Sequence, residues 1–344
     1  MAPPLGGPCR SAQSPTKKGD VYRPLTSTSC RHKVREVELD PNFGYNPNPS
    51  PGPQPPGPAP GPAAAPDYGL LAGLVGKWQG KGFNAIWRPN LLTSGQDRFL
   101  ELNVTDETLE FDTIPGQIPN RGLLQPDIFM AGIRYLQQIS DANVQPPNNG
   151  LHVEPGVWLN IPATTNPAIS ATVARLASIP HGVTIVLQGF ASQATGAPSI
   201  PAINLNPFSI GNPATATAPF PEQNLLTNTQ FRTPNLAAAG ITQEMVNNPN
   251  IVLTVPVQNI TSTVTLQVTS NDLPVVGGGT ADTAFLQGGA AGPNAEPALV
   301  SATFWLETVA GAPDFQQLQY SQTVLLNFNG LSWPHVTVAT LRLI

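Results

Sequence analysis

The sequence predicts an all-β fold, either a barrel or a sandwich. Segments rich in Val, Thr, Ile and aromatic residues follow one another from residue 151 to the last residue, and Pro, Asn and Gly separate them. Few segments have the apolar period of a helix. A long succession of strands with turn residues between them is typical of these two architectures.

The chain begins with a segment that we expect to form no core. Residues 41–66 contain eleven prolines in twenty-six positions, a density that favours an extended polyproline II linker. Residues 1–40 carry seven Lys or Arg against four Asp or Glu and offer no sizeable apolar face. We therefore predict a disordered tail and Pro-rich linker over 1–66 and a folded unit over 67–344. Such an arm is a candidate docking element for a protein partner.

Composition excludes several classes of function. Only 11% of the 344 residues are charged and the formal net charge is -5, whereas nucleic-acid binding needs clustered Lys and Arg. No apolar run approaches the roughly 20 residues of a membrane-spanning helix, and the N-terminus lacks the apolar stretch of a secretory signal. Cys9 and Cys30 form neither a disulfide framework nor a zinc spacing. We expect a cytoplasmic protein, and the sequence leaves open whether it is a homo-oligomer.

Alternation of apolar and polar residues places the strands. The segment LHVEPGVWLNI, residues 151–161, puts His152, Glu154 and Trp158 on one face. Residues 126–139 fit a strand or a helix, 241–248 fit a short helix capped by Thr242, and 191–250 predict a long insertion outside a barrel or over its mouth. We expect further strands at 181–190, 250–260, 262–270, 298–309, 319–328 and 335–344.

The segment GLVGKWQGKGFNAIW, residues 73–87, is typical of the first strand of a small barrel. A tryptophan at this position, Trp78, plugs one end of such a barrel, and the glycines permit sharp coiling. We therefore expect Trp78 in the core.

Four segments, in order, resemble the nitrobindin-like haem-binding β-barrels, a calycin-like family. LVGKWQGKGF (74–83) is similar to their opening Leu-x-Gly-x-Trp-x-Gly-x-Gly pattern, and HVEPG (152–156) to their His-x-Glu-x-Gly signature. IPHGVTIVLQG (179–189) resembles the hairpin that follows. Residues 318–343 resemble the closing strand pair, in which a histidine precedes an Ala-x-Leu-x-Arg-like ending. The family barrels are much shorter, so the arm and the insertions at 191–250 and 270–297 depart from the pattern.

The resemblance implies an antiparallel up-and-down barrel of about ten strands, with haem b near one mouth. His335 would be the proximal iron ligand, and His152 would face the haem as the candidate catalytic residue. Neutral imidazole is a standard haem ligand, and Pro334 suits the first residue of a strand. Alternation from His335 then predicts a cofactor-binding face formed by Thr337, Ala339 and Leu341, with Trp333 at the edge of the macrocycle.

Each of these residues also has a purely structural interpretation. His335 would then be a satisfied strand residue, and His152 would hydrogen-bond to Glu154 or to a backbone carbonyl. His181 is expected in a hairpin turn. Arg175 and Arg342 would pair with haem propionates, although surface exposure is the interpretation that we favour for both.

The predicted function is binding of ferric, His-ligated haem that binds or acts on nitric oxide, peroxynitrite or peroxide. Whether the protein is an enzyme, such as a peroxynitrite isomerase or a peroxidase, stays open. Efficient peroxide cleavage needs a distal base and a cationic partner; His152 is the candidate base, but the sequence assigns no Arg beside it. The rival is a haem-free barrel that holds a fatty acid or another apolar small molecule, since lipocalin-type barrels also open with Gly-x-Trp. A structural or interaction role through the arm is a third hypothesis.

Overall fold

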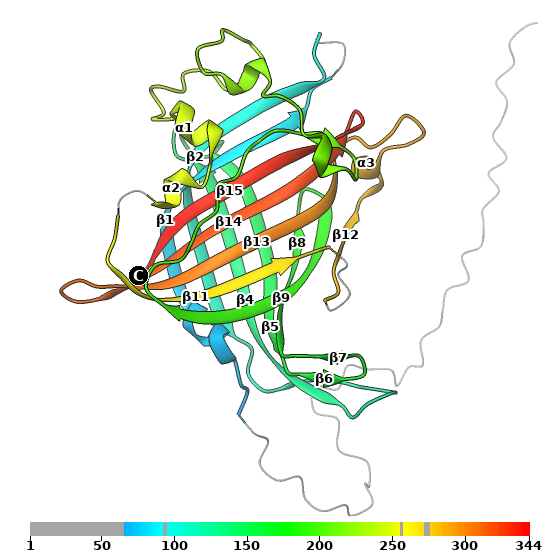
Figure 1. Ribbon diagram of the computed structural model, residues 1–344, viewed down its shortest axis with the longest axis vertical. Helices are drawn as coiled ribbons and strands as arrows, with labels where there is room; N and C mark the ends of the chain where they lie inside the picture. Colours follow the sequence, from blue (N-terminus) through cyan, green and yellow to red (C-terminus); the bar gives the residue numbers. More distant parts are fainter. Residues whose placement is uncertain (1–64, 92–94, 255–256, 272–275) are drawn as a thin grey trace, which may run out of the picture. The chain divides into compact units, whose positions relative to one another are not determined.

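The computed structural model describes residues 65–91, 95–254, 257–271 and 276–344, and the following account concerns these residues. They contain an antiparallel sheet of ten successive strands in which the last strand pairs with the first, so that the sheet closes into a barrel (Figure 1). The prediction of an all-β, up-and-down barrel of about ten strands is confirmed. In order around the barrel the strands are β1 (Gly76–Pro89), β2 (Arg98–Thr113), β4 (Ile128–Asp141), β5 (Gly150–Ile161), β8 (Thr172–Ile179), β9 (Val183–Thr195), β11 (Ile260–Thr269), β13 (Glu296–Val309), β14 (Phe315–Phe328) and β15 (Leu331–Leu343).

The seam between β1 and β15 closes the barrel. Its register places Trp78 opposite Leu343 and Asn84 opposite Thr337. The two glycines that follow Trp78 permit the close approach of these strands. A Cβ at Gly80 would lie 2.1 Å from the backbone oxygen of Thr340, a distance that no side chain tolerates.

One end of the barrel is filled by a tightly packed core. A short helix, η1 (Gly69–Leu74), buries Leu71 and Leu74 there, and the indole Nε1 of Trp78 donates to the backbone oxygen of Leu74 at 2.8 Å. Trp78 is fully buried, as expected for a plug. Trp158 packs edge-on against Phe304 in the same cluster, with ring centroids 5.4 Å apart.

The segment between β9 and β11 packs on the outside of the barrel, against β1, β2 and β15. Backbone hydrogen bonds tie it to β2, with Leu100 N donating to Phe231 O at 3.0 Å, and the indole of Trp87 donates to Leu205 O at 2.8 Å. The predicted long insertion is confirmed, and its apolar residues form a second cluster with the outer face of the barrel. Its elements are β10 (Phe208–Ser209), η3 (Pro213–Thr215), η4 (Pro221–Gln223), α1 (Gln243–Asn247) and α2 (Ile251–Thr254).

Two local expectations for this part of the chain have opposite outcomes. The short helix capped by Thr242 is confirmed as α1, with Thr242 Oγ1 accepting from Met245 N. The expected strand at 250–260 is wrong, because Ile251–Thr254 forms the helix α2. Asn250 anchors this turn, since its side chain donates to Pro201 O at 2.8 Å and accepts from Ser321 at 2.7 Å.

The ambiguous segment at 126–139 is the strand β4. Two short strands pair with barrel strands: β3 (Ile118–Asn120) with β4 and β12 (Gly279–Asp282) with β9. A separate two-stranded sheet is formed by β6 (Thr164–Thr165) and β7 (Ala168–Ile169). One further helix, α3 (Ala284–Gln287), follows β12.

The predicted tail and linker, up to residue 64, lie outside the described residues. None of the helices in the described part of the chain is both long and apolar enough to cross a bilayer.

Candidate functional site

The half of the barrel interior that is not filled by core side chains contains a pocket of about 350 Å³. This volume lies in the range of small-molecule sites. Most of its wall is apolar, and the polar groups gather on β1, β4, β5, β14 and β15 and on the turn between β8 and β9. The apolar lining includes Ile86, Ile139, Leu151, Ile179, Val183, Ile185, Val300, Val324 and Leu326, and the polar lining includes Asn84, Gln137, His152, His181, Tyr320, Gln322, His335 and Thr337.

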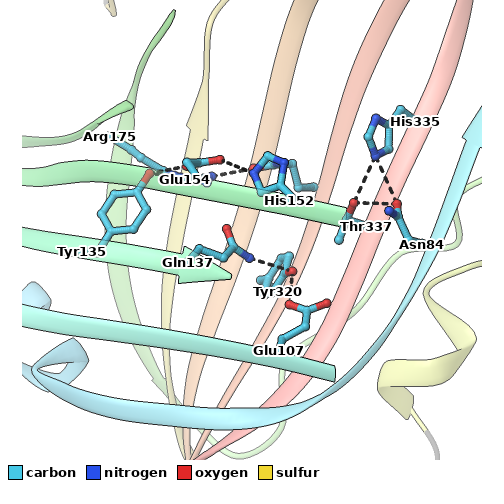
Figure 2. A network of polar contacts seen from close by, with 11 residues as sticks. Asn84, Glu107, Tyr135, Gln137, His152, Glu154, Arg175, Tyr320, His335 and Thr337 are labelled. Carbon is cyan, nitrogen blue, oxygen red and sulfur yellow. Dashed lines mark hydrogen bonds and ion pairs between the residues drawn. The ribbon is translucent and has the colours of Figure 1, made fainter. Parts of the chain in front are cut away.

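His335 lies on β15 and its ring borders the pocket. Its Nε2 is 3.1 Å from Asn84 Oδ1 and 3.4 Å from Thr337 Oγ1 (Figure 2). Asn84 Oδ1 also accepts from the Thr337 hydroxyl at 2.9 Å. Because the amide oxygen of Asn84 only accepts, Nε2 carries the proton of the neutral ring and the lone pair lies on Nδ1, which has no hydrogen-bond partner among the described residues.

The surroundings of His335 keep its imidazole uncharged. Burial, together with the nearby His152 and His181, lowers its pKa to about 3. A neutral imidazole is the form that binds a metal. The described residues contain no group of three or more His, Cys, Asp or Glu side chains that could hold a metal ion.

His152 and His181 form a stacked pair at the pocket wall. Their ring centroids are 5.6 Å apart and their planes differ by 16°. His152 comes from β5 and its Nε2 lies 3.2 Å from Glu154 Oε2. His181 occupies the turn between β8 and β9, as expected, and burial together with His152 lowers its pKa.

Glu154 anchors a buried polar network behind His152. Arg175 Nη2 and the Tyr135 hydroxyl both donate to Glu154 Oε1, and Arg175 also donates to Tyr135 Oη at 2.8 Å and to Gln322 Oε1 at 2.6 Å (Figure 2). Burial alone would raise the pKa of Glu154, but the charge of Arg175 and the hydrogen bonds of His152 and Tyr135 outweigh it and bring it to about 2. The expectation of a surface-exposed Arg175 is wrong, because its side chain is 1% exposed and ion-paired inside the barrel.

A second buried carboxyl, Glu107 of β2, lies near the polar end of the pocket. Tyr320 Oη is 2.5 Å from Glu107 Oε2, and Gln137 Nε2 donates to Tyr320 Oη at 2.9 Å. Thr105 donates to Glu107 Oε1 at 2.7 Å. Burial raises the pKa of Glu107 to about 7, although these hydrogen bonds lower it. The interior therefore holds one carboxyl, Glu154, that is ionised at neutral pH and one, Glu107, that titrates near neutrality.

Some of the residues predicted for the site meet in this pocket and others lie elsewhere. His335, Thr337 and His152 all line it. Ala339 and Leu341 share the inner face of β15 but belong to the packed core. Trp333 belongs to the outer cluster: its ring lies 4.9 Å from Phe328 and 5.3 Å from Trp87.

Three residues of the site, Asn84, Glu107 and Tyr320, were not predicted from the sequence. A weak signal for Glu107 existed, because it shares its strand parity with the buried Leu109 and Phe111. Nothing in the sequence indicates that Glu107 and Tyr320 meet, since 213 positions separate them.

Comparison with known proteins gives a distant structural likeness. No family model and no curated protein matches the chain, so the nitrobindin-like pattern stays a resemblance of motifs. Among solved structures, the crystal structure of Rv2717c from M. tuberculosis is similar over 80% of this chain and 95% of that chain, with 12% identity and a TM-score of 0.36. No functional conclusion rests on so distant a likeness.

Proposed function

We propose that the barrel binds haem b in this pocket, with His335 as the axial iron ligand, and that it binds or acts on a small ligand of the iron. One observation carries the proposal: a neutral imidazole borders a mostly apolar cavity, with one nitrogen held by Asn84 and the other without a partner in the described residues. Iron-ligating histidines commonly donate their second ring N–H to a carbonyl or carboxylate, which fixes the ring. Asn84 has this role for His335.

The residues present fit such a group. A b-type haem needs one strong axial donor and apolar walls, and the pocket offers both. When bound, haem supplies an iron centre that takes small ligands through oxygen or nitrogen. His152, which Glu154 orients through a 3.2 Å contact, supplies an imidazole at the pocket wall to hold or move a proton.

Haem uptake by the purified protein tests this proposal. Titration with haemin should produce a Soret band at one equivalent. His335→Ala should fold as a barrel, judged by circular dichroism, and lose the band, and added imidazole should restore part of it. His32→Ala, a histidine of the N-terminal tail, is the matched control and should bind haem like the wild type. An unchanged spectrum and affinity in His335→Ala would make His335 a structural residue.

The second candidate is a haem-free carrier of an apolar small molecule. It is favoured by the largely aliphatic lining contributed by β4, β8, β9 and β14. The same experiment separates the two candidates. Wild-type protein that never takes up haemin but binds a fatty acid, measured by calorimetry, would support the carrier.

A further inference from the structure

Two buried glutamates inside the barrel, Glu107 and Glu154, differ in their partners. A third buried glutamate of the barrel strands, Glu307 of β13, accepts a hydrogen bond from Gln317. Glu154 is ion-paired with Arg175, whereas no Lys, Arg or His of the described residues forms an ion pair with Glu107, which is 2% exposed. Glu107 has two hydroxyl partners, Tyr320 and Thr105. A buried carboxyl without a cation favours its neutral, protonated form. In acid–base sites, different surroundings likewise separate the pKa values of two carboxyls, so that one is ionised and the other is protonated.

Protonation of Glu107 changes what Tyr320 can donate to. A phenol has one proton and two acceptor lone pairs. In the described residues Tyr320 Oη has two partners, Gln137 Nε2 and Glu107 Oε2, and both point to it (Figure 2). When Glu107 is ionised, Tyr320 donates to it. When Glu107 carries a proton on Oε2, it donates to Oη, both lone pairs of Oη are taken, and the Tyr320 proton needs a third partner.

The pocket is where that third partner can lie, because Tyr320 and Gln137 both border it. We propose that Tyr320, supported by protonated Glu107, donates a hydrogen bond to an acceptor oxygen of the molecule that fills the pocket. The site then selects an apolar ligand that carries a carbonyl or a similar oxygen. This inference goes beyond haem binding and does not depend on iron ligation by His335.

The first strand makes room for this arrangement. A Cβ at Gly82 would lie 2.6 Å from Glu107 Oε1 and 2.7 Å from Thr105 Oγ1. It would also lie 2.4 Å from the backbone oxygen of Val338. Glycine at position 82 therefore allows both the closing of the seam and the burial of the carboxyl beside it.

Few titratable or charged groups act on Glu107. β1 contributes glycines, β4 contributes Gln137 and β14 contributes Tyr320, while a charge on His152 of β5 lowers the pKa of Glu107. Arg175 and Glu154 act on Tyr320 with opposite sign. Burial is the largest influence and brings the pKa of Glu107 to about 7. The Tyr320 donor is thus available to a ligand below about pH 7 and is taken up by Glu107 above it.

The naphthyl ketone Prodan tests the donor, because its emission moves to longer wavelength when its carbonyl accepts a hydrogen bond and it does not titrate near neutrality. Titrations should run from about pH 5.5 to about pH 8.5, on either side of the pKa of Glu107. Emission from the wild-type complex should move to shorter wavelength as the pH rises. Glu107→Gln, which stays neutral, should hold the long-wavelength emission throughout. Tyr320→Phe should emit at short wavelength throughout and bind about tenfold more weakly at low pH.

Tyr135→Phe is the matched control, because Tyr135 is also a buried phenol that donates to a glutamate but does not border the pocket. It should behave like the wild type. Infrared spectra of the ligand-free protein should show a protonated-carboxyl signal at low pH that Glu107→Gln reduces, while the contribution of Glu307, whose pKa burial also raises to about 7, persists.

The inference is overturned by a carboxyl band that Glu107→Gln leaves unchanged, by wild-type emission that ignores pH, by a Tyr320→Phe variant that matches the wild type, or by wild-type protein that does not bind Prodan. Haemin uptake and the Prodan response are measured separately on the wild-type protein, so failure of haem binding and failure of this donor are distinguishable.

Discussion

The imidazole Nε2 of His335 lies 3.1 Å from Oδ1 of Asn84, across the seam at which the last strand pairs with the first. Residues 251 positions apart in the sequence thus orient one another at the wall of a single pocket. The orientation of His335 depends on this contact more than on Thr337, whose hydroxyl is 3.4 Å from Nε2.

Loss of Asn84 should therefore weaken haem binding. Asn84→Leu removes the acceptor of the His335 N–H, and changes of this kind cost about 10–100-fold in metal affinity. Haemin titration followed at the Soret band measures the effect. Thr337→Val, which removes the longer contact, should cost less. Equal haem affinity in Asn84→Leu and wild type would show that Asn84 does not position the ligand.

His152 should tune ligand binding at the iron without holding the haem. His152→Ala removes the imidazole that Glu154 orients, so haem content should persist while the azide affinity of the ferric protein changes. Val153→Ala, on the outward face of the same strand, is the control. Apo protein from His152→Ala would assign iron ligation to His152 instead.

Glu107 should destabilise the fold as the pH rises. Its folded pKa of about 7 exceeds the unfolded value of 4.5, so the unfolded chain binds fewer protons between these values. The free energy of unfolding then falls with rising pH, by up to about 3 kcal/mol from this group. Glu107→Gln removes this loss, and its advantage over wild type should grow from about pH 4.5 to about pH 7 in urea unfolding. A difference that is constant with pH contradicts the prediction.

Glu154 should have the opposite dependence. Its folded pKa of about 2 lies below the unfolded value, so its contribution is complete above pH 4.5 and is lost as the pH falls towards 2. Arg175→Met leaves Glu154 buried without its cation and should cost about 3–5 kcal/mol of unfolding free energy. Adding Glu154→Met should recover part of this loss. A single Arg175→Met variant as stable as wild type would show that the pair contributes little.

Removal of residues 1–64 should leave the melting transition nearly unchanged, because the described residues close the barrel and its core without them. Deletion to residue 75 is the informative control. It also removes Leu71 and Leu74, both fully buried, and should lower the melting temperature strongly. A large loss of stability in the shorter deletion would show that the tail packs on the barrel.

Strand alternation predicts much of the barrel interior but not which interior residues border a cavity. The inner face of β15 carries His335, Thr337, Ala339 and Leu341 as predicted, yet the last two are packed in the core. Trp333 shares the parity of His335, but its ring packs with Trp87 outside the pocket. The position of the Trp333 ring depends on where the insertion packs against the barrel. Sequence periodicity contains no information about that packing.

The hydrogen-bonded pair formed by Glu107 and Tyr320 could not be predicted from the sequence, for a different reason. In β2, Leu100 and Leu102 are buried under the insertion while Thr105 and Glu107 are buried inside the barrel. A strand covered on both faces loses the alternation that would assign an inward carboxyl. The contact with Tyr320 also depends on the register of strands distant in sequence, which a single sequence does not specify.

The closure of β1 against β15 has a consequence for how the chain reaches its fold. β1 leaves the ribosome early, but its second edge finds its partner only when the final residues have been made. Its outer face, with Phe83 and Trp87, also stays uncovered until the insertion has been synthesised. Contacts of such long sequence separation form slowly, and an open strand edge with exposed aromatic rings invites pairing between chains. A chain that lacks its last strand would present this edge permanently, so C-terminal truncation should lead to aggregation.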